Sequence, residues 1–200
     1  LAAARENGIH IPSLCHLPEI NEVGACRVCV VEIEGSDRLA AACNTVVQEG
    51  MVIHTNSKRA ITARQTNVRL MLSAHDGLCP WCSRNQNCTL QDLAKEMGIL
   101  QKRFEQKIPE NNWDMTLPLI RFDSKCVHCL RCINVCGKIQ GMNVWDLLGT
   151  GTRANVGVAG GRKITEAQCT FCGQCITHCP VGALTERDDT QKVRDALADP

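Results

Sequence analysis

The chain has 200 residues and a formal net charge of +1, with 15 cysteines, three Phe, three Trp and no Tyr. So few aromatic residues favour several small units over one large core, with inorganic clusters replacing apolar side chains locally. The odd number of cysteines excludes complete disulfide pairing, and the lack of a basic stripe with aromatic platforms excludes nucleic-acid binding.

The cysteine content also bears on location. Thiolate ligands are compatible with a reducing compartment, and no apolar run approaches the roughly 20 residues that a membrane span needs. We therefore expect a soluble, cytoplasmic protein without a membrane span.

Residues 1–56 are predicted to form a small domain with four cysteines. A helix should end near Gly8, and strands are predicted over residues 28–34, 39–43 and 51–55. The cysteines follow the pattern Cys-x10-Cys-x2-Cys-x13-Cys, whereas plant-type ferredoxins place their first pair closer together. We expect a 2Fe-2S cluster here, bound by Cys15, Cys26, Cys29 and Cys43.

A zinc site of four cysteines is the alternative interpretation, since zinc sites also use Cys-x2-Cys. Gly24 and Ala25 favour iron-sulfur chemistry, because small residues let backbone N–H groups approach bridging sulfurs.

A small helical domain is predicted next, over residues 57–117. A helix should begin at the N-cap Ser57 and run to the histidine of the following site. A second helix should begin with a capping box of Thr89 and Asp92 and end at Gly98. The apolar face of the first helix is expected to consist of Ile61, Val68, Met71 and Leu72.

The loop between these helices contains one histidine and three cysteines. The first site takes four of the 15 cysteines and the two runs described below take eight, which leaves three cysteines, one ligand short of a 4Fe-4S site. Because the vacancy falls beside a histidine, we expect a 4Fe-4S cluster bound by His75, Cys79, Cys82 and Cys88. A neutral imidazole in place of a thiolate should raise the potential of that cluster.

Residues 118–185 contain the run Cys-x2-Cys-x2-Cys-x3-Cys twice. In such runs three thiolates bind one 4Fe-4S cluster and the fourth binds the other, which predicts a bacterial-type 2[4Fe-4S] ferredoxin domain with crossed pairing. One cluster would be bound by Cys126, Cys129, Cys132 and Cys179. The other would be bound by Cys169, Cys172, Cys175 and Cys136.

Two further segments belong to this part of the chain. Residues 149–154 fit a dinucleotide fingerprint only superficially and are predicted to form a Gly-rich hairpin or interface loop. Residues 186–200 are predicted to form a C-terminal helix or a linker towards a catalytic domain or partner.

The expected fold class is therefore α+β, in a modular iron-sulfur protein. Its modules are a ferredoxin-like (β-grasp) 2Fe-2S domain, a small helical domain with a one-His three-Cys cluster, and the double 4Fe-4S ferredoxin domain. The expected cofactors are one 2Fe-2S cluster and three 4Fe-4S clusters.

The ligand order resembles the N-terminal iron-sulfur portion of the large subunit of multimeric NAD(P)-linked hydrogenases, including the electron-bifurcating type. The resemblance covers essentially the whole chain and rests on residues 21–29, 75–88, 126–141 and 169–184. Similar modules open the alpha subunit of some NAD-linked formate dehydrogenases. The complex I iron-sulfur subunit is expected to share only the first two sites in close form.

This resemblance implies an electron relay between a hydrogen-activating site and a flavin/NAD(P) module. The implied partners are a flavin/NAD(P)-binding subunit, a small 2Fe-2S subunit and a hydrogenase catalytic domain or subunits, in a hetero-oligomer. No cysteine remains once the four sites are filled, so we expect no catalytic centre within these 200 residues. The alternatives are the same relay module of an NAD-linked formate dehydrogenase and a zinc-stabilised interaction scaffold.

Overall fold

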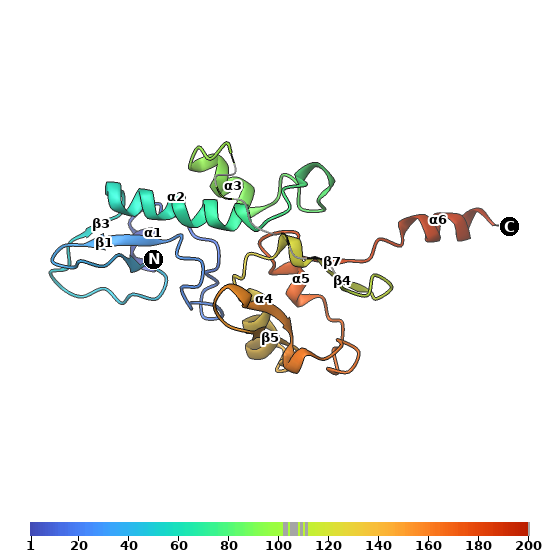
Figure 1. Ribbon diagram of the computed structural model, residues 1–200. Coiled ribbons are helices and arrows are strands. Elements are labelled where there is room, and N and C mark those ends of the chain that lie inside the picture. The colour runs from blue at the N-terminus through green and yellow to red at the C-terminus, as the bar shows by residue number, and fades with distance from the viewer. Residues whose placement is uncertain (102–103, 105–107, 109, 111, 200) are drawn as a thin grey trace.

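The computed structural model describes residues 1–101, 104, 108, 110 and 112–199. Figure 1 shows an elongated arrangement, in which the N-terminal part lies at one end and the last helix extends away at the other. Helices and short strands are mixed along the chain, as the α+β prediction expects. The domain predicted over residues 57–117 includes residues 102, 103, 105–107, 109 and 111, which lie outside the described residues.

The helices are α1 (Ala2–Glu6), α2 (Lys58–Ser73), α3 (Thr89–Glu96), α4 (Arg131–Asn134), α5 (Gln174–Thr177) and α6 (Thr190–Ala198). The strands are β1 (Val30–Ile33), β2 (Ala40–Ala41), β3 (Ile53–His54), β4 (Leu119–Arg121), β5 (Trp145–Leu148), β6 (Asn155–Val158) and β7 (Leu184–Glu186). Over the described residues these strands form three small antiparallel sheets, ordered β2-β1-β3, β4-β7 and β5-β6. Among the same residues, no helix has the length and apolar character needed to cross a membrane.

The N-terminal unit contains the predicted helix and strands in shorter form. α1 is followed by Gly8, which takes a positive φ of 70° and ends the helix as predicted. β1 is the central strand, with Val30 opposite Ala41 of β2 and Ile33 opposite Ile53 of β3. The small apolar core of this sheet includes two of the predicted 2Fe-2S ligands, so the sheet positions that site directly.

α2 begins at its predicted N-cap, where the Ser57 Oγ accepts the backbone N–H of Ala60 at 3.2 Å. The predicted apolar face is wrong at Ile61, whose residue is 42% exposed. Residues four apart share one face of a helix, and the buried face of α2 follows that spacing from Ala60, one position before Ile61. This face contains Ala60, Arg64 and Val68.

Arg64 is buried because α2 packs across β1. Its guanidinium donates to the Val30 carbonyl oxygen from Nε at 2.9 Å and from Nη2 at 2.7 Å. Hydrogen bonding of this kind compensates for the loss of water around a buried charge. Arg64 therefore ties α2 to the central strand of the N-terminal sheet.

The capping box predicted for α3 is wrong, since Cys88 is the N-cap and Thr89 is the first helical residue. The Thr89 backbone N–H donates instead to the Pro180 carbonyl oxygen at 3.0 Å. The start of α3 is thus satisfied by a distant part of the chain, which a local sequence pattern does not reveal. Gly98, with a φ of 62°, follows the helix as predicted.

The ferredoxin-like unit is closed by the pairing of β4 with β7, in which Leu119 lies opposite Glu186. The Gly-rich segment of residues 149–154 joins the antiparallel strands β5 and β6, so the hairpin prediction is confirmed. Gly149 is required in this turn, because a Cβ at its position would lie 2.6 Å from the Arg153 carbonyl oxygen. Beyond β7 the predicted C-terminal helix is present as α6, and Figure 1 shows it projecting from the rest of the molecule.

Arg64→Met is expected to lower the free energy of unfolding by about 1–3 kcal/mol, because it leaves the buried Val30 carbonyl without its donor. Thermal unfolding of the metal-loaded protein measures the loss. Arg59→Met on the same helix is the matched control, since its pair with Glu32 at 2.7 Å lies at the surface and should contribute less. Equal losses in the two variants would contradict the role given to Arg64.

Candidate functional site

The four cysteines of the N-terminal unit form one buried group. The Cys15 backbone N–H donates to the Cys26 Sγ at 3.4 Å, and a hydrogen bond from the Cys15 side chain lowers the pKa of Cys26 to about 6. Burial raises the pKa of Cys43 to about 12, and the nearby Cys29 adds to the rise. Gly24 directs its backbone N–H at the Cys43 sulfur, as expected of a small residue beside these ligands.

The three cysteines of the second group lie together before and at the start of α3. Burial raises the pKa of the Cys88 thiol, and the neighbouring thiols of Cys82 and Cys79 add to the rise. His75 is buried at the other end of the loop, and its Nδ1 accepts the Gly77 backbone N–H at 3.1 Å. In that tautomer the ring proton is on Nε2, so metal binding through Nε2 would require the proton to move to Nδ1, where Asp76 Oδ1 lies 3.5 Å away.

Two cavities in the ferredoxin-like unit are each lined by four thiols, three from one cysteine run and the last from the other run. The Cys126 cavity is lined by Cys126, Cys129, Cys132 and Cys179. The Cys169 cavity is lined by Cys169, Cys172, Cys175 and Cys136. The fold thus places the eight thiols in the arrangement that crossed pairing requires.

The chemistry of these cavities suits a positively charged metal cluster. Burial raises the pKa of both Cys129 and Cys175 to about 12, and neighbouring thiols oppose ionisation further. A metal ion deprotonates a coordinating thiol outright, so bound iron would resolve this crowding. Over the described ranges, no group of three or more His, Cys, Asp or Glu side chains is placed to hold a single metal ion. The thiols instead surround cavities, which fits the several metal ions of an iron-sulfur cluster.

Two residues beside these cavities, Arg121 and Trp145, were not predicted from the sequence to have a role at the sites. Arg121, only 2% exposed, lines the Cys126 cavity and donates from Nη2 to the Asp123 Oδ1 at 2.5 Å. Its guanidinium lies 5.7 Å from the ring centroid of Trp145, which lines the other cavity. Burial raises the pKa of Cys126, and the positive charge of Arg121 opposes that rise. Burial also raises the pKa of Cys175, where a hydrogen bond with the Trp145 side chain opposes the rise. An arginine inside an otherwise apolar strand was the available sequence signal for Arg121.

The second group docks directly on the Cys126 cavity. The Asp76 backbone N–H donates to the Ser124 carbonyl oxygen at 3.0 Å, and the Ser124 Oγ donates to the Asp76 Oδ2 at 3.0 Å. A Cβ on Gly182 would lie 2.5 Å from the Cys82 Sγ, so only glycine allows this approach. Ser124 and Gly182 are close in sequence to two cysteines of the Cys126 cavity. The loop of the second group therefore lies against that cavity.

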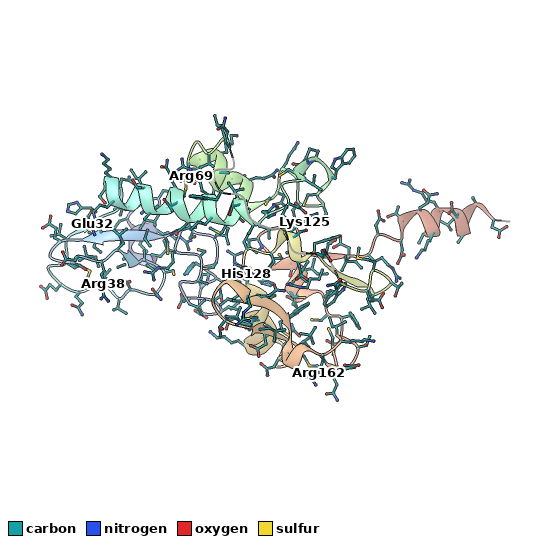
Figure 2. All side chains as sticks on the ribbon, viewed as in Figure 1. Glu32, Arg38, Arg69, Lys125, His128 and Arg162 are labelled. Atoms are coloured by element: carbon teal, nitrogen blue, oxygen red, sulfur yellow. The ribbon has the colours of Figure 1, made fainter. Side chains whose placement is uncertain are left out.

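A groove lies between α2 and the loop that begins the Cys126 cavity. Leu70 and Met71 of α2 line one side, and His128 and Leu130 line the other. Figure 2 labels His128 at this meeting of the two units. The residue is exposed overall, but partial desolvation of its ring lowers the pKa of His128, which favours the neutral imidazole and fits a hydrogen-bonding or tuning role.

Three family models match successive parts of the chain. A 2Fe-2S iron-sulfur cluster binding domain matches residues 1–58. The NADH-ubiquinone oxidoreductase-G iron-sulfur binding region matches residues 64–103, and the ferredoxin-like domain of NADH-quinone oxidoreductase subunit 3 matches residues 118–185. The expectation that the complex I subunit shares only the first two sites is therefore wrong, because the third match covers the two cysteine runs as well.

Individual proteins are similar over almost the whole chain. The NADP-reducing hydrogenase subunit HndD of Solidesulfovibrio fructosivorans is 38% identical over 100% of this chain and 35% of its own length. The alpha subunit of the NADPH-Fe(3+) oxidoreductase of Geobacter sulfurreducens is 35% identical over 94% of this chain and 22% of its own length. The mitochondrial NADH-ubiquinone oxidoreductase 78 kDa subunit of Candida albicans is 31% identical over 94% of this chain and 26% of its own length.

A solved structure shares the arrangement as well as the sequence. It is the crystal structure of an NAD+-reducing [NiFe]-hydrogenase in the H2-reduced state, with a TM-score of 0.84 and 28% identity over 94% of this chain and 80% of that one. The chain spans about a third or less of the length of the curated relatives named above. These matches show that the chain belongs to the iron-sulfur domains of the G-type subunits of NADH-quinone oxidoreductase, a complex I-related family that includes subunits of NAD(P)-linked hydrogenases.

Proposed function

We propose that this chain is the electron-relay portion of a multi-subunit NAD(P)-linked hydrogenase, passing electrons between a hydrogen-activating site and a flavin/NAD(P) module. The observation that carries the proposal is the crossed arrangement of eight thiols around two cavities, with two further thiol groups upstream. Similarity to an NADP-reducing and to an NAD+-reducing hydrogenase supports the choice of enzyme.

We assign a cluster to each group. The N-terminal group would bind a 2Fe-2S cluster through Cys15, Cys26, Cys29 and Cys43. The second would bind a 4Fe-4S cluster through His75, Cys79, Cys82 and Cys88. The Cys126 and Cys169 cavities would each bind a 4Fe-4S cluster, and these groups, when bound, supply one-electron carriers.

The chain's own residues have three tasks in such a relay. The buried cysteines hold the sites in fixed places and away from water. Arg121 and backbone N–H groups such as that of Gly24 place positive charge beside thiolates, which stabilises the ionised ligands. Contacts between Ser124 and Asp76 keep neighbouring sites close together. Position and electrostatics, rather than bond-making by side chains, are the protein's contribution.

The proposed partners are a flavin/NAD(P)-binding subunit, a small 2Fe-2S subunit and the hydrogenase catalytic domain or subunits. We also propose a cytoplasmic location, because all 15 cysteines are free of disulfides and suit a reducing compartment. Similarity to an NADPH-Fe(3+) oxidoreductase subunit supports a second candidate, the same relay in another NAD(P)-linked oxidoreductase such as a formate dehydrogenase.

Metal analysis tests the cofactor assignment. The anaerobically purified protein should contain about 14 iron and as much acid-labile sulfide, two from the 2Fe-2S cluster and four from each 4Fe-4S cluster. Treatment with a chelator and oxidant should remove the colour and lower the melting temperature together, since cluster loading and folding are coupled. A colourless protein that contains zinc would overturn the relay in favour of an interaction scaffold.

His75→Cys is expected to lower the potential of one 4Fe-4S cluster by on the order of 100 mV, because a thiolate adds a negative charge that favours the oxidised state. Redox titration followed by electron paramagnetic resonance measures the shift. His54→Cys is the matched control, since that exposed ring belongs to β3 of the N-terminal sheet and pairs with Glu34 at 2.8 Å. If no cluster potential changes in His75→Cys, His75 is not a ligand.

A further inference from the structure

Asn21 is a fully buried polar residue, with 0% of its surface exposed. It belongs to the N-terminal unit, where it forms an isolated antiparallel bridge with Leu17 between two of the 2Fe-2S ligands in sequence. Burial of an amide is costly unless every polar atom finds a partner. The partners of Asn21 are therefore informative.

The side chain of Asn21 connects two separate metal sites. Its Nδ2 donates to the carbonyl oxygen of Cys15 at 2.7 Å and to the carbonyl oxygen of Cys129 at 3.0 Å. Its Oδ1 accepts from the Asn134 Nδ2 at 2.5 Å. Both amide hydrogens and the amide oxygen are thus used. One nitrogen atom joins a cysteine of the N-terminal group to a cysteine of the Cys126 cavity.

Neighbouring side chains reinforce this connection from the same direction. Arg131 donates from Nε to the Cys15 carbonyl oxygen at 3.2 Å and from Nη2 to the His16 carbonyl oxygen at 3.0 Å. Lys138 donates from Nζ to the Ile20 carbonyl oxygen at 2.8 Å. Arg131 and Lys138, which follow Cys129 in the chain, therefore donate hydrogen bonds to backbone carbonyls of the segment that begins at Cys15.

The chemistry of the junction suits an amide and few other side chains. Two carbonyl oxygens face one point, which calls for two donors on a single atom, and Asn supplies them on a short side chain. A carboxylate of the same shape would face both carbonyls without a hydrogen to give. A leucine of similar size would fill the space and leave the Cys129 carbonyl without this donor.

We propose that Asn21 is a positioning residue that fixes the separation between the 2Fe-2S site and the 4Fe-4S site of the Cys126 cavity, and so sets the rate of electron transfer between them. The inference rests on the proposed function. Electron transfer slows steeply as two centres move apart, and Asn21 donates a hydrogen bond to the backbone of one predicted ligand of each centre, Cys15 and Cys129. Its role concerns the distance between the sites, because it contacts carbonyl groups and not the sulfurs themselves.

Electron spin relaxation in the loaded full chain tests this separation. In the parent protein, reduction of the 4Fe-4S cluster in the Cys126 cavity should accelerate relaxation of the reduced 2Fe-2S signal, since the two spins are close. In Asn21→Leu that acceleration should be lost or markedly reduced, while iron and sulfide contents and the midpoint potentials of both clusters stay at parent values. Asn67→Ala is the matched control, because its Nδ2 donates to the Arg27 carbonyl oxygen at 2.8 Å within the N-terminal part of the chain. It should retain full acceleration.

Full acceleration in a loaded Asn21→Leu protein overturns the proposal. If Asn21→Leu does not load its clusters, Asn21→Ala takes its place, because it also removes both donors to the Cys15 and Cys129 carbonyls but adds no apolar bulk between them. A smaller acceleration in that variant supports the proposal, and an unchanged one overturns it. A parent protein that lacks the signals of the reduced 2Fe-2S and 4Fe-4S clusters would instead contradict the proposed function. Failure of the proposed function is thus distinguishable from failure of the role given to Asn21.

Discussion

The crossing of the two cysteine runs is the constraint on which the ferredoxin-like unit depends. Cys179 lies with the first run and Cys136 with the second, so each cavity is complete only when distant parts of the chain meet. The pairing of β4 with β7 and the hairpin of β5 with β6 bring those parts together. The core of this unit contains the cysteines themselves, which explains how a chain with so few aromatic residues can pack around its cofactors.

The Cys126 cavity occupies the junction between three sites. The loop of the second group contacts it through Asp76 and Ser124, and the N-terminal group contacts it through Asn21. The Cys169 cavity belongs to the same ferredoxin-like unit as the Cys126 cavity. Trp145, which lines the Cys169 cavity, lies beside the guanidinium of Arg121, which lines the Cys126 cavity. The contacts favour a branched arrangement, in which the two upstream thiol groups each meet the Cys126 cavity, the proposed site of one 4Fe-4S cluster.

The cysteine spacing, a local property of the chain, predicted a grouping for all 15 thiols. The structure brings the eight thiols of the two runs together around two cavities, while the metal binding of every group stays a prediction. Helix and turn signals such as Ser57, Gly8 and Gly98 were equally local and were confirmed. The wrong predictions concern residues whose hydrogen bonds or burial depend on residues distant in the sequence. Thr89 donates its N–H to the ferredoxin-like unit instead of forming a capping box, and Arg64 is buried because a strand carbonyl needs a donor. Asn21 gave no sequence signal, since its role exists only once two units meet.

The central claim is that the 4Fe-4S site of the Cys126 cavity is the meeting point of both upstream sites. The most direct measurement is a stepwise redox titration of the fully loaded parent protein, with spin relaxation recorded for each cluster signal. We predict that reduction of this cluster accelerates relaxation of both the 2Fe-2S signal and the signal of the His75 site. If either signal continues to relax as an isolated centre, the branched relay is contradicted.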